Sequence, residues 1–234
     1  DIHTHILPGV DDGAETFADA IAMARIAVAD GITHVFATPH HRGFRPLPIN
    51  EVAARAAELQ SVLDASGVGL VVLPGHEVQL CDDVLEDWER GLAGPLGDSD
   101  YVLTEPPFQT YDHRTEALLF RLMDWHCVPI LAHPERIGAI QDDWRLLERF
   151  VDRGGLVQIT AACLVGYGRA CETAEILLRR GMVHFLASDA HDPVVRVPRL
   201  AAARDRAAEI VGSARARQLV AAPPSLLGSR RKTA

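Results

Sequence analysis

Lysine is almost absent from this chain of 234 residues: of its 23 basic side chains, Lys232 is the single lysine and all the others are arginine. No block of basic residues occurs, and 32 acidic side chains give a formal net charge of −9. This balance argues against nucleic acid or an anionic membrane surface as the main partner. A phosphate site in this chain is therefore expected to use arginine, whose planar guanidinium can donate two hydrogen bonds to one phosphate.

The chain also lacks a Cys-x-x-Cys pair, a long apolar run and a basic leader. Its four cysteines are widely spaced, and no apolar run approaches the roughly 20 residues of a membrane helix. The first residues, DIHTHILPGV, do not resemble a signal peptide. We therefore expect a cytoplasmic protein with reduced thiols and no membrane insertion.

Short runs rich in valine, isoleucine and leucine alternate with longer segments of helical periodicity, which is typical of βα units around a parallel sheet. We predict one α/β domain over residues 1–234: a seven-stranded βα barrel of the TIM type, with an open doubly wound sheet as the alternative. Residues from about 221 to 234 are expected to form a flexible C-terminal tail. The predicted strands are residues 2–7, 34–38, 70–73, 101–104, 129–132, 156–160 and 184–187. The predicted helices are residues 16–30, 49–66, 113–126, 142–153, 170–180 and a pair within 198–220.

Six of the seven predicted strands end on a histidine, an aspartate or a glutamate. A single histidine at a strand end is more often a hydrogen-bonded residue than a metal ligand. His3 and His5, however, lie two residues apart and so face the same side of one strand, and in a barrel the strand ends converge. So many ionisable groups at one rim would be costly without cations. The pattern predicts two or three metal ions, and imidazole and carboxylate without thiolate favour Mn, Fe, Zn or Co.

The motifs DIHTHILPGVDDG, ATPHH, LPGHE, LTEPP, LAHPER and LASDAH follow one another between residue 1 and about residue 196. In this order they resemble the PHP superfamily of metal-dependent phosphoesterases, and more narrowly the manganese-dependent protein-tyrosine phosphatases of bacterial capsule and exopolysaccharide loci. The resemblance implies a distorted seven-stranded βα barrel and three divalent metal ions, Mn²⁺ before Fe, Zn, Co or Mg. The implied ligands are His3, His5, Glu77 and Asp189 for one ion, Glu77, Glu105 and His133 for the second, and Asp12, His40 and His191 for the third.

The same resemblance implies the reaction and its substrate. A hydroxide bridging two metal ions would attack phosphotyrosine, with Arg136 and Arg196 binding the phosphate. Close relatives tend to show Arg-Pro-x after the last motif, where this chain has Arg196-Val197-Pro198, so the placement of Arg196 rests on less than that of Arg136. His41 is a further candidate for binding phosphate or protonating the leaving group. The implied partner is a phosphotyrosine protein such as an autophosphorylating tyrosine kinase of polysaccharide export, and the loop at residues 42–50 lies where it would be recognised.

Three other interpretations compete with this one. Cys163 and Arg169 fit the Cys-x5-Arg spacing of cysteine-dependent phosphatases, although Ala162 stands where those enzymes carry histidine, and two fixed positions match easily by chance in an arginine-rich chain. The metal site could instead hydrolyse a small phosphomonoester such as histidinol phosphate, or a nucleic-acid phosphodiester, which the acidic charge disfavours. A non-catalytic metal-binding domain is the third, and the complete ligand set argues against it.

Overall fold

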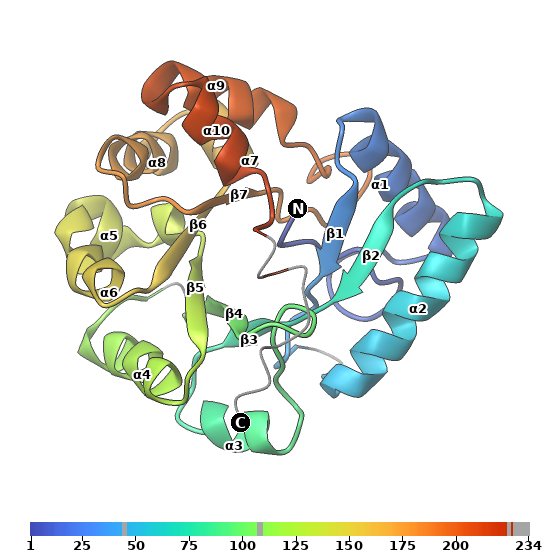
Figure 1. The fold of residues 1–234 in the computed structure, drawn as a ribbon, viewed down its shortest axis with the longest axis horizontal. Helices are drawn as coiled ribbons and strands as arrows, with labels where there is room; N and C mark the ends of the chain where they lie inside the picture. Colours follow the sequence, from blue (N-terminus) through green and yellow to red (C-terminus); the bar gives the residue numbers. More distant parts are fainter. Residues whose placement is uncertain (44–45, 107–109, 224–225, 227–234) are drawn as a thin grey trace.

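The structure, a computed structural model, describes residues 1–43, 46–106, 110–223 and 226. Parallel strands surrounded by helices form an α/β fold, which confirms the predicted class (Figure 1). One sheet pairs β1 (His34–Ala37) with β2 (Val71–Pro74). The other has five strands in sequence order, all parallel: β3 (Glu77–Gln79), β4 (Tyr101–Glu105), β5 (Val128–Ala132), β6 (Leu156–Thr160) and β7 (Phe185–Ala187).

The strands of the structure differ from the predicted set at two places. Residues 2–7 do not form a strand: Thr4 alone makes parallel bridges, to Ala37 and to Ala190. Backbone hydrogen bonds run to both neighbours, from the His5 N–H to the Ala190 carbonyl and from the Thr38 N–H to the Thr4 carbonyl, each at 2.8 Å. Side-chain bonds add to them, because Thr4 Oγ1 donates to the Phe36 carbonyl at 2.7 Å and the Thr4 N–H donates to Thr38 Oγ1 at 3.1 Å. The unpredicted strand is β3, which follows β2 after a short break and joins the second sheet. A third bridge, between His40 and Glu77, connects the two sheets.

Helices surround the strands in Figure 1. The longer ones match their predictions to within a few residues, and Thr16 begins the first with a capping box to Asp19. The predicted helix at 142–153 is broken into a 3-10 turn and a short α-helix, and α3, α5 and α7 are too short to give a periodic signal. The helices are α1 (Phe17–Ala29), α2 (Ile49–Ala65), α3 (Val84–Glu89), α4 (His113–Asp124), α5 (Gly138–Asp142), α6 (Glu148–Asp152), α7 (Ala161–Val165), α8 (Arg169–Arg179), α9 (Ala201–Val211) and α10 (Ser213–Leu219), with 3-10 turns η2 (Pro134–Arg136) and η3 (Trp144–Leu147).

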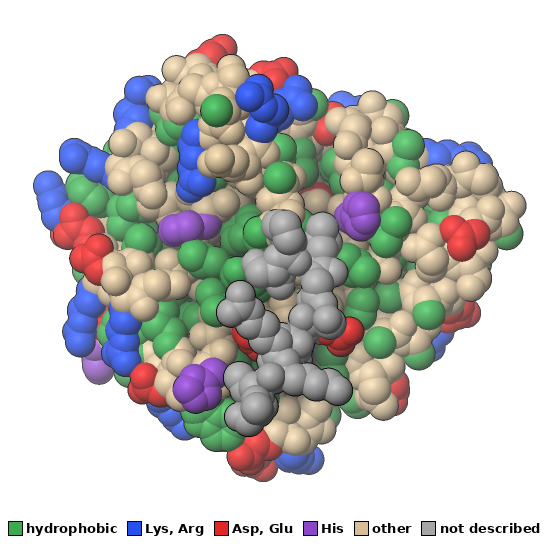
Figure 2. All heavy atoms as spheres, viewed as in Figure 1, with side chains coloured by type: hydrophobic (Ala, Val, Ile, Leu, Met, Phe, Trp, Pro, Cys, Tyr) green, Lys and Arg blue, Asp and Glu red, His purple; other side chains and the backbone are tan. Residues whose placement is uncertain are grey.

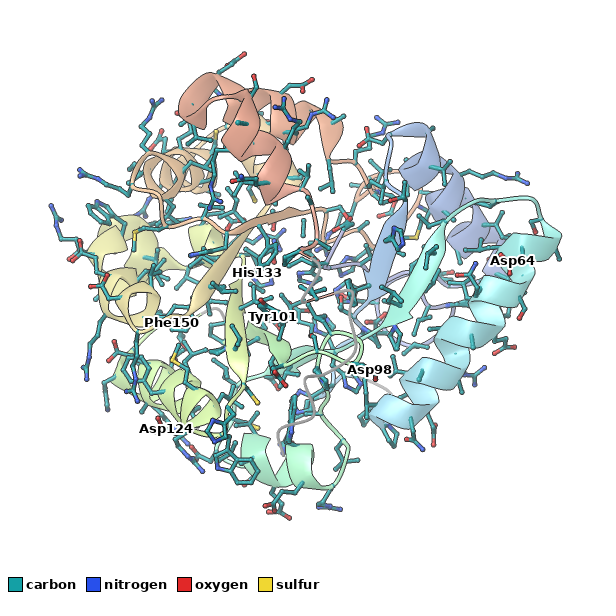
Figure 3. All side chains as sticks on the ribbon, in the orientation of Figure 1. Asp64, Asp98, Tyr101, Asp124, His133 and Phe150 are labelled. Carbon is teal, nitrogen blue, oxygen red and sulfur yellow. The ribbon has the colours of Figure 1, made fainter. Side chains whose placement is uncertain are left out.

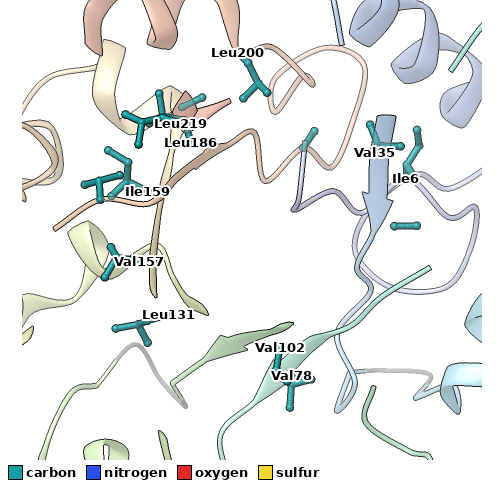
Figure 4. Packing of buried hydrophobic residues seen from close by; sticks show 14 of the residues in the cluster. Ile6, Val35, Val78, Val102, Leu131, Val157, Ile159, Leu186, Leu200 and Leu219 are labelled. Carbon is teal, nitrogen blue, oxygen red and sulfur yellow. The ribbon is translucent and has the colours of Figure 1, made fainter. Parts of the chain in front are cut away.

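Two clusters of buried apolar residues hold the fold together. The larger includes Leu131, Val157 and Leu186, which lie on neighbouring strands in Figure 4 and pack with helix residues. The smaller includes Phe36 and Leu226, so one residue of the predicted flexible tail is buried, while residues 224–225 and 227–234 lie outside the described part of the chain. Both basic and acidic side chains occur around the edge of the molecule in Figure 2. Among the described residues, none of the helices has the length and apolar character needed to span a bilayer.

Candidate metal centre

The structure brings together all nine side chains that the sequence nominates as metal ligands. They come from the segment before α1, from the ends of β1, β4, β5 and β7, and from β3. Figure 3 shows one of them, His133, toward the middle of the molecule. Each group has donor atoms within 4.8 Å of one another: His5, Asp12, His40 and His191; His3, His5 and Asp189; His3, Glu77 and His133; His40, Glu77 and Glu105.

The spacing of the donor atoms suits bound cations. His3 Nε2 lies 3.2 Å from His5 Nε2, and these nitrogens lie 3.4 and 3.6 Å from Asp189 Oδ1. Ligands bound about 2.0–2.2 Å from one ion lie about 3–3.6 Å from each other, so these separations fit a shared ion. Without one, the two Nε2 atoms would direct lone pairs at each other whenever both rings are neutral with the proton on Nδ1. The donor set therefore fits divalent metal ions of the class that binds imidazole and carboxylate.

Two residues that the sequence did not nominate fix those imidazoles. His5 Nδ1 lies 2.6 Å from Asp11 Oδ2, and His3 Nδ1 lies 3.1 Å from Gln158 Oε1. Each contact favours a proton on Nδ1 and leaves Nε2 free to bind a metal ion. Two features of the sequence could have pointed to these residues. Asp11 lies in an Asp-Asp-Gly turn close to His5, and Gln158 is a polar residue inside an otherwise apolar strand. Gly13 is required in that turn, because a Cβ there would lie 1.9 Å from the His5 carbonyl oxygen.

Glu77 is the central carboxylate and belongs to two of the groups. It is 1% exposed, and its oxygens lie 2.9 Å from His40 Nδ1 and 3.0 Å from His133 Nε2. Burial alone would raise the pKa of Glu77, but His3 and these neighbours hold it well below its usual range. Burial and the adjacent Glu77 raise the pKa of Glu105. The centre thus concentrates negative charge where cations would bind.

Two of the histidines, His5 and His40, hold protons strongly when no metal is bound. Burial disfavours the charged imidazole of His5, but hydrogen bonds to Asp11 and Glu77 outweigh it and raise the pKa to about 10. Hydrogen bonds to Asp12 and Glu77 likewise outweigh burial at His40 and raise its pKa to about 11. Protons therefore compete with metal ions for this site.

Two residues of the centre adopt left-handed backbone conformations. His133 has φ 35° and Asp189 has φ 53°, and His126 is the third such non-glycine residue in the described part of the chain. This conformation costs about 1–3 kcal/mol at each residue. The adjoining strands β5 and β7 hold the two residues in place, so local strain is maintained where the ligands converge.

The two predicted arginines lie side by side at Asp189. Arg136 Nη1 and Arg196 Nη2 each lie 2.7 Å from Asp189 Oδ2. Arg196 takes this place even though the Val197-Pro198 that follows it departs from the motif of close relatives. Arg136 Nη2 also donates to Thr160 Oγ1 at 3.0 Å. Glu135, the residue before Arg136, is buried and accepts a hydrogen bond from the Thr160 N–H at 2.9 Å. Burial disfavours the charged form of Arg136, but Asp189 and Glu135 outweigh it and raise its pKa.

His41 does not join the centre. It is buried, and its Nδ1 accepts a hydrogen bond from the Gln79 N–H at 2.8 Å while its Nε2 lies 3.2 Å from Asp87 Oδ2. Both ring nitrogens are therefore engaged, and this geometry lends no support to the prediction that His41 binds phosphate or protonates a leaving group. In the adjoining loop, Arg42 also binds Asp87, while residues 44–45 lie outside the described part of the chain.

The Cys-x5-Arg segment is not a phosphate-binding loop. Cys163 lies within α7, and burial together with Glu135 raises the pKa of its thiol to about 11. Arg169 begins α8 and pairs with Asp142. Cys163 therefore lies in a helix and Arg169 pairs with another carboxylate, and this geometry does not support the cysteine-phosphatase interpretation.

The comparisons with known proteins agree with this geometry. Residues 1–227 match the family described as capsular polysaccharide synthesis, CpsB/CapC. The tyrosine-protein phosphatase YwqE of Bacillus subtilis is 38% identical over 201 residues, covering 84% of this chain and 78% of YwqE. The tyrosine-protein phosphatase CpsB of Streptococcus pneumoniae is 27% identical, covering 94% of this chain and 93% of CpsB.

Solved structures show the same relationship. A structure from work on YwqE and the pneumococcal CpsB, described there as unique metal-dependent tyrosine phosphatases, superposes with a TM-score of 0.88 at 34% identity, covering 94% of this chain and 90% of the other. Histidinol phosphate phosphatase of Lactococcus lactis shares the fold at a TM-score of 0.55 and 10% identity, covering 91% of this chain and 93% of the other. The chain therefore belongs to the CpsB/CapC family of capsular polysaccharide synthesis proteins.

Proposed function

We propose that this protein is a metal-dependent protein-tyrosine phosphatase. One observation carries the proposal. Nine imidazole and carboxylate side chains gather at one site, and two arginines pair with one of these carboxylates, that of Asp189. YwqE and CpsB, whose chains it matches along most of their length, are tyrosine-protein phosphatases. Hydrolysis of a phosphate monoester needs an activated water and compensation of phosphoryl charge, and this set of side chains is suited to both.

The centre is proposed to hold three divalent ions, with Mn²⁺ as the leading candidate. The proposed ligands are those implied by the resemblance: His3, His5, Glu77 and Asp189; Glu77, Glu105 and His133; Asp12, His40 and His191. When bound, the ions would lower the pKa of coordinated water and neutralise charge on the phosphoryl group. The overlap among the observed groups, in which Glu77 occurs twice, supports a cluster of ions rather than isolated sites.

The chain's own residues would then bind and orient the substrate. Arg136 and Arg196 would donate hydrogen bonds to the non-bridging phosphoryl oxygens, in place of part of their present contact with Asp189. Thr160 holds one guanidinium nitrogen of Arg136 and so limits the direction from which it can donate. Asp11 and Gln158 keep the imidazoles of His5 and His3 turned toward the centre.

We also propose the overall architecture, the cellular location and the protein substrate. The two sheets and the bridges at Thr4 and His40 support a single distorted barrel with the centre at its rim. Four free cysteines support a location in the cytoplasm. The membership of the CpsB/CapC family supports a phosphotyrosine protein of polysaccharide production as the substrate, with an autophosphorylating tyrosine kinase as the leading candidate.

A substrate panel tests the proposal. Enzyme stripped of metal should lose activity toward phosphotyrosine peptide, and Mn²⁺ should restore it. The panel should include histidinol phosphate, because a phosphatase for that ester shares the fold. Full activity without metal, or a clear preference for histidinol phosphate over phosphotyrosine peptide, would contradict the proposal.

A further inference from the structure

A hollow of about 350 Å³ lies beside the two phosphate-binding arginines. It is lined by residues of α7, of the loop between β7 and α9, and of α9 itself, and it shares Arg136 and Arg196 with the metal centre. Its other lining residues include the apolar side chains Val165, Val195 and Val197. A group attached to a phosphate held by the arginines would therefore meet an apolar surface on this side.

Exposed apolar side chains gather at the border of this hollow. Among the described residues, the four most exposed large hydrophobic side chains are Tyr167 at 97%, Val194 at 82%, Val195 at 81% and Val165 at 49%. Two of them line the hollow, and each of the other two lies within two residues of a lining residue. Exposed apolar side chains beside a charged centre favour a binding surface.

The exposure of the two neighbouring valines is built into the loop. The Asp192 carboxylate accepts hydrogen bonds from the N–H groups of Val194, Val195 and Arg196 at 2.7, 2.6 and 3.0 Å. The His191 N–H also donates to the Arg196 carbonyl at 2.9 Å. The same turn therefore fixes the backbone of Arg196 and directs the two valines outward before any partner binds.

An arginine adds charge to this apolar hollow. Arg199 lines it, is exposed, and forms no ion pair with a carboxylate of the described residues. An acidic side chain on a polypeptide bound here would therefore be attracted to Arg199.

We propose that this hollow and its apolar border bind the polypeptide that flanks the phosphotyrosine of the substrate. An apolar flanking side chain packs against Val165, Val194 and Val195, and an acidic flanking side chain pairs with Arg199. The inference rests on the proposed phosphatase function and adds to it a preference for acidic and apolar residues near the phosphotyrosine.

The test compares Val195→Ser and Arg199→Glu with wild type on three substrates. These are a phosphotyrosine peptide flanked by Glu and Leu, one flanked by Lys and Ser, and p-nitrophenyl phosphate, which has no flanking residues. Val28→Ser on α1 and Arg121→Glu on α4 serve as controls, because both residues are exposed and lie on other helices. Each test variant should lower kcat/KM for the Glu/Leu peptide about tenfold, equivalent to about 1.4 kcal/mol, and leave the small ester unchanged.

Charge reversal gives a second readout. Arg199→Glu should raise kcat/KM for the Lys/Ser peptide relative to the Glu/Leu peptide, which Arg121→Glu should not do. An equal loss on peptide and small ester, or no change on either peptide, would overturn the inference while leaving the phosphatase function intact. A wild-type enzyme that hydrolyses p-nitrophenyl phosphate but neither peptide would instead contradict the proposed function, and the inference with it.

Discussion

Arg136 and Arg196 donate to the same oxygen, Oδ2 of Asp189, each at 2.7 Å, while Oδ1 of that carboxylate faces His3 and His5. One aspartate thus joins the two arginines proposed to bind phosphate to two histidines of the candidate metal centre. Replacing Asp189 with Ala should lower kcat by about 1000-fold, or about 4 kcal/mol, because a ligand and the anchor of both arginines are lost together. Steady-state kinetics with far-UV circular dichroism checks this. An unchanged kcat in a folded variant would contradict the assignment.

Arg136 should not tolerate lysine. An ammonium group cannot donate both to Thr160 Oγ1 and to phosphate in the fixed fork of a guanidinium. We expect Arg136→Lys to lower kcat/KM for phosphotyrosine peptide and for p-nitrophenyl phosphate by about 100-fold. The matched control is Arg121→Lys on the exposed face of α4. Comparable activity in both lysine variants would show that the guanidinium geometry is unimportant.

Gln158 should matter through metal affinity. Gln158→Leu keeps the side chain similar in size but removes the Oε1 contact that orients His3 Nδ1. Loss of such a contact typically weakens metal binding by 10–100-fold, roughly the range expected here. Competition with a chelator, read by activity at increasing Mn²⁺, measures the change. If excess Mn²⁺ fails to restore kcat, Gln158 has a role other than orienting a ligand.

Metal binding should release protons near neutral pH. In the metal-free protein the pKa values of His5 and His40 are raised to about 10 and about 11, so both imidazoles are charged at pH 7. A metal ligand must be neutral, so loading should release about two protons, and affinity should weaken as pH falls. Titration calorimetry in buffers of different ionisation enthalpy counts these protons. No release at pH 7 would show that these histidines are already neutral.

Cys163 should be dispensable for catalysis, although Cys163 and Arg169 have the Cys-x5-Arg spacing of cysteine-dependent phosphatases. Its thiol is protonated at neutral pH and lies in a helix. Cys163→Ser should keep kcat within about twofold of wild type, as expected for a residue outside the reaction. Progress curves with p-nitrophenyl phosphate are sufficient. A loss of two orders of magnitude would revive the thiolate mechanism.

The sequence predicted the gathering of these nine side chains better than it predicted the strands that carry them. Ligand spacing such as His3-x-His5 survives even where residues 2–7 form only a bridge, because hydrogen bonds from Thr4 hold the same alternation. Residue type at a strand end was therefore a more robust signal than periodicity.

What the sequence did not reveal depends on contacts between distant segments. Gln158 reaches His3 across 155 positions, and no local pattern specifies such a contact. His40 and His41 are adjacent and chemically identical, and only the packing of Asp87 and Gln79 shows that His41 faces away from the centre. Short helices such as α7 contain too few residues for a periodic pattern to emerge.

Glu77 belongs at once to the group with His133 and to the group with Glu105, and His3, His5 and His40 are shared in the same way. A metal ion bound at one group would therefore alter both the charge and the orientation of the ligands that it shares with the neighbouring group. Ions should not fill this centre as independent equivalents, and a partly loaded enzyme should be a distinct species with its own affinity for the remaining ions. Activity plotted against added Mn²⁺ would then rise with a steepness set by a single shared carboxylate.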